Sequence, residues 1–278
     1  MRGVKDKLLQ VLVYVCAGMT AALLLFIIGY IFYRGIPNLS RSLLSGQTSY
    51  IKNTIGILPN ILNTLYIIPV TMFGVIPLGV GAAIYLTEYA SNDKLVKVIT
   101  FASETLTGIP SIIFGLVGML FFVQLLGLKP GVLAGGLTLV VMVLPTIMTN
   151  TRESLMTVPR SYREGALALG SGKWHMVRTV VLPNAVDGII TGCILAIGRI
   201  IGESAALLFT AGLGLALNDF FTALNASSAT LTVALYVYAT ERGETGVAFA
   251  IATVLMVITF LLNLMASFVA DKLKRKGE

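Results

Sequence analysis

Charged residues are scarce in this chain. Asp, Glu, Lys and Arg make up only 12% of the 278 residues, hydrophobic residues make up 56%, and the mean hydropathy is +0.89. Because soluble globular domains carry about 25% charged residues, this composition excludes a soluble globule and indicates an integral membrane protein. The net charge of +7 does not indicate nucleic-acid binding, since the basic residues lie between apolar runs and not on one stripe. We therefore expect the lipid bilayer as a partner, and no nucleic acid.

Residues that bind metals or form disulfides are also scarce. The two cysteines, Cys16 and Cys193, each lie inside an apolar run, so we predict two buried free thiols. The single histidine, His175, has no second histidine or thiol near it in the sequence, which argues against a metal site and favours a surface or interface role. We expect no metal and no cofactor on this chain.

The sequence lacks the motifs of an ATPase or a hydrolase. Residues 170–174, GSGKW, resemble the end of a phosphate-binding P-loop. However, Leu167 stands where the first glycine of that motif belongs, and Trp174 stands where the Mg²⁺-binding hydroxyl belongs. No Ser-His-Asp arrangement or nucleophile elbow is present either. We therefore expect no catalytic residues here, and any ATP hydrolysis that drives this protein must occur on another subunit.

Long uncharged runs predict six membrane-spanning helices. A helix needs about 20 apolar residues to cross the hydrocarbon, and the predicted spans lie at residues 8–33, 54–87, 98–126, 131–149, 188–217 and 247–270. The first run is longer than the core of a signal peptide, which has about 7–15 residues, so it is expected to be retained. Prolines at positions 59, 69 and 77 predict a lead-in segment and a kinked second helix, and Pro145 is expected to bend or end the fourth.

Residues 220–240 form a further uncharged run that raises the question of a seventh span. Ser, Thr and Asn between residues 224 and 232 argue against one, and so does the distribution of charge. With six spans, 14 Lys and Arg residues share the side of the two termini and residues 150–183, and five lie on the opposite side. Cytoplasmic segments carry the excess of basic residues. Both termini and residues 150–183 are therefore predicted to be cytoplasmic, and residues 220–240 to form a short helix at the outer mouth.

Residues 150–183, which we call the docking loop, contain a polar stretch between two apolar runs. Ser161 and Glu164 have the S-x-x-E spacing of a capping box, in which the hydroxyl caps a helix and the carboxylate reaches back to the Ser161 amide. Gly170 is able to adopt the left-handed conformation that ends this helix, and Ser171 to cap a second helix running to Pro183. The sequence therefore predicts a helix, a glycine elbow and another helix.

This stretch resembles the EAA loop of ABC importer permeases. In that motif Glu-Ala-Ala is followed after three residues by Gly, and after nine more by Ile, one residue and Leu-Pro. The matching positions here are Glu164, Ala166, Gly170, Leu182 and Pro183. Gly165 replaces an Ala and Val180 replaces the Ile, and both changes keep the size and polarity class. The resemblance implies that the loop inserts into a groove of a cytoplasmic ATPase subunit. The alternative is an ordinary amphipathic loop on the membrane surface.

Arg199 and Glu203 are ionisable residues inside the predicted fifth span, four residues apart and therefore one helical turn apart. Each charged side chain at the membrane centre costs about 2.5–3.5 kcal/mol on insertion scales, so such residues face a bundle interior or a wet pathway. The planar guanidinium of Arg199 suits an oxyanion, and Glu203 is expected to neutralise it until an anion arrives. The alternative is a structural ion pair that fastens the helix to a neighbour.

Two stretches, one of them around Arg199, make the resemblance to ABC importer permeases more specific. Residues 199–205, RIIGESA, and residues 106–115, LTGIPSIIFG, are similar to the phosphate-specific permeases of the PstA type, and the likeness covers nearly the whole chain. It implies an all-α membrane protein with the six-helix transmembrane domain of a type I ABC importer and a cytoplasmic coupling helix. It also implies three partners: a homologous permease of the PstC type, two ATPase subunits of the PstB type, and an extracytoplasmic phosphate-binding protein of the PstS type.

Glu104 is a further carboxylate within a predicted span, near its cytoplasmic end. It either lies at the membrane interface, where its cost is small, or partners Arg199 or lines the exit of the pathway. Gly108 and Pro110 in the same span are expected to allow close helix packing and a kink.

The expected organisation has two parts, a peripheral first helix with its outer connection at residues 1–53 and a permease core at residues 54–278. The expected function is the pore subunit of an ATP-driven phosphate importer in a bacterial or archaeal cytoplasmic membrane. A permease for sulfate or molybdate is one alternative. A membrane scaffold that signals nutrient state is another, and in that case neutralising Arg199 would leave the output unchanged.

Overall fold

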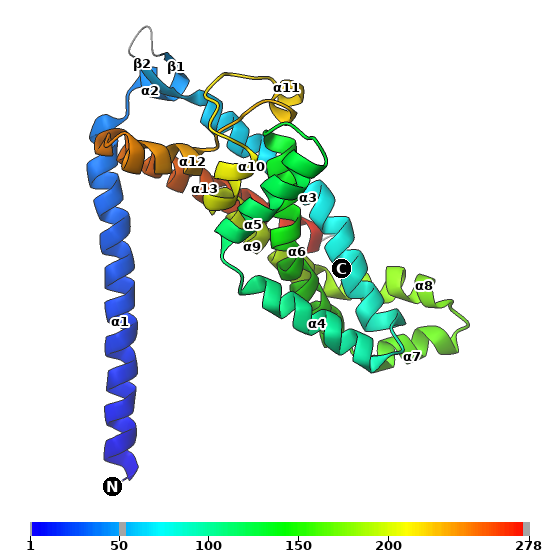
Figure 1. The fold of residues 1–278 in the computed structure, drawn as a ribbon. Helices are drawn as coiled ribbons and strands as arrows, with labels where there is room; N and C mark the ends of the chain where they lie inside the picture. The colour runs from blue at the N-terminus through cyan, green and yellow to red at the C-terminus, as the bar shows by residue number, and fades with distance from the viewer. Residues whose placement is uncertain (1, 50–53, 275–278) are drawn as a thin grey trace.

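The computed structural model describes residues 2–49 and 54–274, and its regular structure is almost entirely helical (Figure 1). Five helical segments are long and apolar enough to cross a membrane: Leu9–Asn38, Leu58–Tyr89, Val132–Thr157, Lys173–Gly202 and Thr245–Phe268. A further pair, Asp93–Thr107 and Ser111–Leu125, passes the same test but is bent by 101°. With this pair counted as one broken span, the prediction of an all-α protein with six membrane spans is confirmed.

Helix α1 (Arg2–Gly35) stands apart from the other helices over most of its length (Figure 1). Near its C-terminal end it packs against α13 (Thr245–Lys274), where the Thr253 hydroxyl donates a hydrogen bond to the Ile31 carbonyl at 3.3 Å. Most of its large apolar side chains are exposed, which suits a surface that faces lipid. Cys16 lies on this helix and is exposed, so its predicted burial inside the protein is wrong, whereas Cys193 is half-buried.

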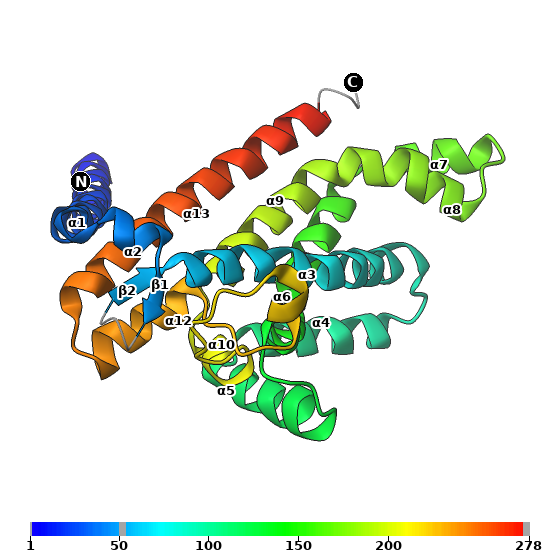
Figure 2. The ribbon, with the colours of Figure 1, turned by 90° about the horizontal axis from the view of Figure 1, so that it is seen from above.

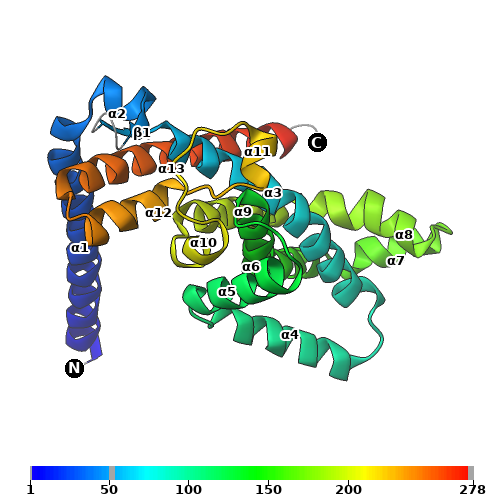
Figure 3. The same ribbon diagram turned by 45° about the horizontal axis from the view of Figure 1, so that its top comes forward.

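Helices α3 (Leu58–Ile84) and α6 (Val132–Thr157) form the centre of the bundle, and α9 (Leu182–Gly202) packs against both. Figures 2 and 3 show this centre between α13 on one side and α4 and α5 on the other. Small residues let α3 and α6 approach closely, because a Cβ at Gly79 would clash with the Ile147 side chain. The buried apolar side chains between these helices include Ile67, Val75, Leu139, Val143 and Ile200.

Proline residues begin helices in this bundle but do not end them. Pro59 lies in the first turn of α3, where a missing N–H costs no hydrogen bond, whereas Pro183 in α9 lies inside a longer continuous helical segment. Pro145 lies inside α6, which continues to Thr157. Pro145 therefore does not end the helix, and residues 150–157, expected in the docking loop, belong to α6. Packing against neighbouring helices stabilises a helix across such a proline.

The predicted third span is two helices, α4 (Asp93–Thr107) and α5 (Ser111–Gly118), and α5 continues into η3 (Met119–Leu125). The kink expected at Gly108 and Pro110 is confirmed by the bend of 101°. Close packing at Gly108 is not found, because a Cβ there would meet only a carbonyl oxygen at 3.5 Å. The close helix contacts of this span lie at Gly115, which packs against Ala206, and at Gly118, which packs against the Thr138 side chain.

The segment between α9 and α13 contains no membrane-crossing helix, which confirms that residues 220–240 are not a seventh span. It forms α10 (Ala205–Thr210), α11 (Phe220–Leu224), α12 (Leu231–Tyr236) and η5 (Val237–Glu241). The loop between α11 and α12 is held by α3, because the side-chain amides of Asn60 and Asn63 both donate to the Ala229 carbonyl, at 2.9 and 3.1 Å. Helix α12 is largely buried against α13 and α3, so it lies inside the bundle and not on its surface.

The connection after α1 contains short elements that the sequence analysis does not predict. A 3-10 turn, η1 (Ile36–Asn38), leads to α2 (Arg41–Ser45) and to β1 (Gln47–Ser49). Strand β1 pairs antiparallel with β2 (Thr54–Ile57), which is the lead-in segment before α3. Figure 1 shows this hairpin and α11 at the opposite end of the molecule from the docking loop.

Candidate docking site and pathway residues

The docking loop forms a helical hairpin that projects from the bundle (Figure 3). Its first helix is α7 (Arg160–Ala168), and its second begins at α8 (Lys173–Met176). Between them Gly170 has φ +83°, a left-handed conformation, so the predicted glycine elbow is confirmed. The amides of Gly170 and Ser171 donate to the carbonyls of Leu167 and Ala166, at 3.0 and 3.1 Å, and so satisfy the end of α7.

The predicted caps of the two docking helices are wrong. Helix α7 begins after Pro159, so Ser161 lies in its first turn and neither its hydroxyl nor the Glu164 carboxylate makes a capping hydrogen bond. The fixed φ of proline, here −58°, sets the helix start earlier than the serine. Helix α8 begins after Gly172, and Ser171 does not cap it.

The second docking helix also does not end at Pro183. Helix α8 continues through the π-helical η4 (Val177–Val181) directly into α9, so the helix of the docking loop and the fifth span form one continuous helical segment. Met176, Val177 and Val181 are buried in a cluster that also contains Leu155 and Val158 of the α6 end. This apolar contact anchors the second docking helix to the bundle.

The tip of the hairpin presents apolar side chains to solvent. Leu169 is 90% exposed and Trp174 is 57% exposed, and Leu167 and His175 are also exposed. Exposed apolar groups gathered at one place are typical of a protein interface. Of the residues that match the EAA motif, Glu164 and Pro183 are exposed as well, and Ala166 and Leu182 pack partly against the bundle. Gly165 is exposed, and a Cβ added there would meet no atom within 4 Å.

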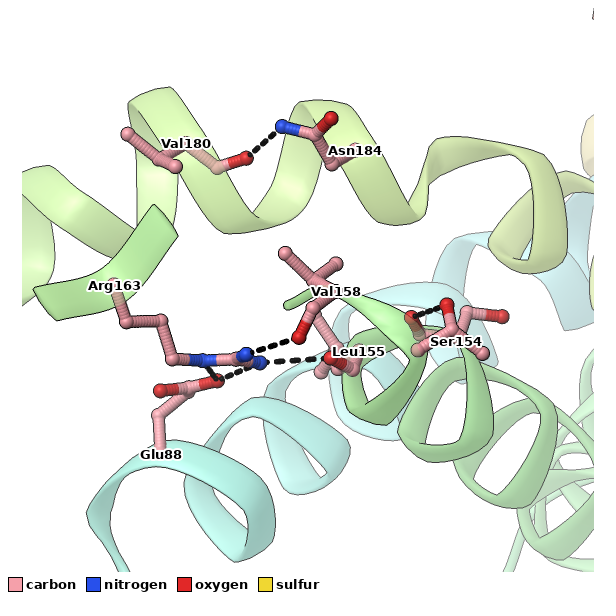
Figure 4. Close-up of polar contacts among 8 residues, drawn as sticks. Glu88, Ser154, Leu155, Val158, Arg163, Val180 and Asn184 are labelled. Atoms are coloured by element: carbon pink, nitrogen blue, oxygen red, sulfur yellow. Dashed lines mark hydrogen bonds and ion pairs between the residues drawn. The ribbon is translucent and has the colours of Figure 1, made fainter. Parts of the chain in front are cut away.

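A partly buried ion pair joins α7 to the bundle (Figure 4). The Arg163 guanidinium donates from Nε and Nη2 to Oε1 of Glu88, at 3.0 and 2.9 Å. Its Nη2 also donates to the Leu155 carbonyl at 2.7 Å, and its Nη1 donates to the Val158 carbonyl. Glu88 lies in η2 (Tyr85–Tyr89), which continues α3, and both carbonyls belong to the end of α6. The arginine therefore satisfies carbonyls that a helix end leaves without partners.

A cleft of about 600 Å³ lies beside this ion pair. Side chains of both signs line it: Glu88, Asp93, Arg152, Arg160, Arg163 and Glu164. Three of these, Arg160, Arg163 and Glu164, come from α7, so the cleft is continuous with the docking hairpin. Its mixed charge suits polar side chains of a protein partner better than a ligand of a single charge.

The structure separates Arg199 from Glu203. Helix α9 ends at Gly202, and Glu203 follows in an extended conformation with ψ 127°, so the two residues do not share a helical turn. Within the part of the chain that the structure describes, no ion pair links them. The Glu203 carboxylate instead accepts a hydrogen bond from the Ala206 amide at 3.0 Å, at the start of α10. The expectation that Glu203 neutralises Arg199 is therefore wrong for this conformation.

Arg199 and Glu203 are nevertheless both at least half-buried within the bundle. Arg199 is half-buried on α9, and Glu203 is buried, with 9% of its surface exposed. The Glu203 carbonyl accepts a hydrogen bond from the Thr232 hydroxyl of α12 at 2.6 Å. The break between α9 and α10 is thus held by the segment that follows it, and Arg199 lies one turn before the break.

Glu104 is exposed on α4, and no hydrogen bond or ion pair of its side chain is found among residues 2–49 and 54–274. It does not pair with Arg199 in this conformation. Because α4 precedes the 101° bend, Glu104 lies on a helix oriented differently from α5.

Comparisons with known proteins identify the family. The model of the "Binding-protein-dependent transport system inner membrane component" family matches residues 75–275. The chain belongs to this family. Its members are permease subunits of ABC transporters and not enzymes, and residues 75–275 contain the docking loop, Glu88, Arg163, Arg199 and Glu203.

Individual relatives extend the similarity over the whole permease. The chain is 42% identical to the "Probable ABC transporter permease protein YqgI" of Bacillus subtilis, over 76% of this chain and 72% of that protein. It is 31% identical to the "Phosphate transport system permease protein PstA" of Pasteurella multocida, over 95% of this chain and 94% of that protein. The permease is therefore a multi-pass protein of the inner membrane.

Solved structures show the same fold. An alginate ABC importer aligns with a TM-score of 0.63 at 14% identity, covering 91% of this chain and 95% of that one. The MetNI methionine ABC transporter aligns with a TM-score of 0.61 at 20% identity, covering 80% of this chain and 96% of that one. The prediction of a type I ABC importer transmembrane domain is confirmed.

Sequence reasoning overlooks two residues of the permease, Glu88 and Arg163. Arg163 directly precedes Glu164, and Glu88 is the first charged residue after the second apolar run. Their charges are visible in the sequence, but 75 residues separate them. Only the tertiary fold brings them together. Lys173 and Tyr89 form a second such contact, with Nζ 5.0 Å from the ring centre.

Proposed function

We propose that this chain is the pore subunit of an ATP-driven importer that moves inorganic phosphate into the cytoplasm. The observation that carries the proposal is the similarity to permeases named for phosphate transport, which extends over nearly the full length of both chains. Arg199 supports it, since a half-buried guanidinium inside a membrane span suits a passing oxyanion. We assign Arg199 to the substrate pathway, with Glu203 shaping the break beside it and Glu104 near its cytoplasmic end.

The partners follow from the same proposal. The pore is formed with a homologous permease of the PstC type, energy comes from two ATPase subunits of the PstB type, and phosphate arrives on a binding protein of the PstS type. The docking loop contacts the ATPase. The residues assigned to this contact are Glu164, Gly165, Ala166, Gly170, Leu182 and Pro183. The exposed apolar tip, with Leu169 and Trp174, supports the assignment because residues 2–49 and 54–274 leave it uncovered.

This proposal places the docking loop and both termini in the cytoplasm. The excess of Lys and Arg on that side supports the orientation. Residues 1–53 would then form a peripheral helix and its outer connection, and residues 54–278 the core that surrounds the pathway. The contact of α1 with α13 near only one end of α1 supports a peripheral position.

The test is uptake of radiolabelled anions into vesicles that contain the complete complex, the binding protein and ATP. We expect ATP-dependent accumulation of phosphate that excess unlabelled sulfate or molybdate does not reduce. Uptake of sulfate or molybdate without uptake of phosphate would show that the transported substrate is that oxyanion and not phosphate. ATP hydrolysis without uptake of any of the three would favour a scaffold that signals nutrient state.

A further inference from the structure

One guanidinium connects the docking hairpin to both central helices of the bundle. Arg163 belongs to α7, its carboxylate partner Glu88 continues α3 through η2, and its two carbonyl partners, Leu155 and Val158, end α6 (Figure 4). A planar guanidinium carries five donors in a fixed fork, so it can hold several acceptors in one geometry. Any displacement of the Arg163 side chain therefore acts on α3 and α6 together.

The pair is mostly buried, although both residues also line the cleft beside α7. The Arg163 side chain is 16% exposed and the Glu88 side chain is 5% exposed. In such surroundings screening by salt is weak, and loss of one partner leaves a buried charge without compensation. Removing one partner is therefore expected to cost more than it would in an exposed ion pair.

Helix α7 has few other attachments to the bundle. None of its residues is buried, and Ala166 packs only partly against the apolar cluster at the end of α6. The second docking helix differs, because Met176, Val177 and Val181 are fully inside that cluster. The docking hairpin thus has an apolar attachment on its second helix and an ionic attachment on its first.

The two helices that Arg163 holds pack closely against each other. Close approach at Gly79 and Gly136 interlocks α3 with α6, since a Cβ at either position would clash with the side chain of the opposite helix. Packed helices of this kind shift between discrete arrangements and do not deform gradually. A single attachment at their ends is then sufficient to bias the arrangement of both.

We propose that Arg163 and Glu88 are the positioning residues that convert movement of the docking hairpin into movement of α3 and α6, and so couple ATP hydrolysis to transport. The inference rests on the proposed function, and it identifies the contact through which the docking hairpin acts on α3 and α6. Networks of buried ion pairs and hydrogen bonds carry such coupling between distant sites. The contact of Lys173 with Tyr89, also in η2, reinforces the connection from the second docking helix.

The decisive variant is the double substitution Glu88→Gln with Arg163→Gln. It removes the ion pair without leaving one buried charge unpaired, so the complex is expected to assemble. We expect ATP hydrolysis to continue while the number of anions imported per ATP falls about tenfold, a loss within the usual range for coupling between sites. Arg163→Lys keeps the charge but lacks the fork that reaches α3 and α6 together, and a smaller fall is expected.

Two matched controls remove an exposed charge elsewhere on the same side of the bundle. Lys97→Gln on α4 and Glu153→Gln on α6 change residues that are exposed and do not line the cleft beside α7. The import of anions per ATP is expected to match the wild type in both. All variants are compared at equal amounts of assembled complex in the same vesicles, with the anion that the wild type imports.

Equal import per ATP in the wild type and in the variants that assemble would overturn the inference. Two further outcomes would also overturn it. One is a fall in the amount of assembled complex with an unchanged number of anions imported per ATP. The other is loss of assembly in both the double variant and Arg163→Lys, because the pair would then serve folding alone. Failure of the proposed function is seen separately. In that case the wild-type complex itself imports no phosphate, whatever the variants do.

Discussion

The Glu203 carboxylate accepts a hydrogen bond from the Ala206 amide across the break between α9 and α10, at 3.0 Å. The acidic residue of the membrane motif therefore serves the backbone of its own segment and not the arginine one turn before it. A carboxylate at the start of a helix accepts orphan N–H groups that have no partner within the helix. This role changes what substitutions at the motif are expected to do.

Glu203→Gln is predicted to be mild and Glu203→Ala severe. The amide oxygen of Gln can still accept the Ala206 N–H, whereas Ala removes the acceptor and costs about 0.5–2 kcal/mol, the usual value of a lost helix cap. Thermal unfolding of the assembled complex in detergent and anion uptake in vesicles measure the two effects. A Glu203→Gln variant as defective as Glu203→Ala would show that the charge of Glu203, and not its cap, is required.

Arg199→Gln is predicted to abolish uptake of phosphate and to leave the complex assembled, since a neutral amide lacks both the charge and the bidentate fork. Arg199→Lys separates these two contributions. Partial uptake with Lys would indicate that the charge alone attracts the anion, and complete loss would indicate that the planar geometry is needed. Uptake by Arg199→Gln at the wild-type rate, at equal amounts of complex, would exclude Arg199 from the pathway.

Gly170→Val is predicted to disturb the docking elbow, because φ +83° is costly for a β-branched residue, by about 1–2 kcal/mol. ATP hydrolysis should become uncoupled from uptake while the membrane helices stay intact. Gly127→Val is the matched control, since Gly127 has φ +70° and also has open space around it, but lies in a turn far from the docking hairpin. The docking assignment would fail if both variants transported equally well.

The orientation is tested by cysteine labelling in intact cells, in a background with the two native cysteines replaced. Gly172→Cys lies in the docking hairpin and Gly127→Cys in the turn after η3, and both positions are open. We expect an impermeant thiol reagent to label position 127 and not position 172. Labelling of position 172 from outside would reverse the topology.

The docking loop shows which local features the sequence predicts and which it does not. Gly170 was predictable because a left-handed residue at a helix end is a local requirement that glycine meets best. The cap at Ser161 was not predictable, because Pro159, with its fixed φ, sets the start of the helix before the serine. The ends of the helices at residues 149 and 183 were misjudged for a related reason. A proline inside a long helix loses one hydrogen bond, but the helix continues through it when neighbouring helices and turns stabilise the rest of the segment.

The sequence by itself determined the membrane location, the number of spans and the position of the docking loop. Each of these depends on the composition of a continuous stretch, because a bilayer selects runs of apolar residues by length and the basic residues between them by side. These properties need no contact between distant parts of the chain.

Only the tertiary structure decided which charges meet. Arg199 and Glu203 are four residues apart, yet a break in the backbone separates them, and Arg163 and Glu88 are 75 residues apart, yet helix packing joins them. A buried charge takes whichever partner the packed helices bring within hydrogen-bonding distance, since leaving it unpaired is costly. That choice is made by the folded bundle, and the order of residues along the chain does not fix it.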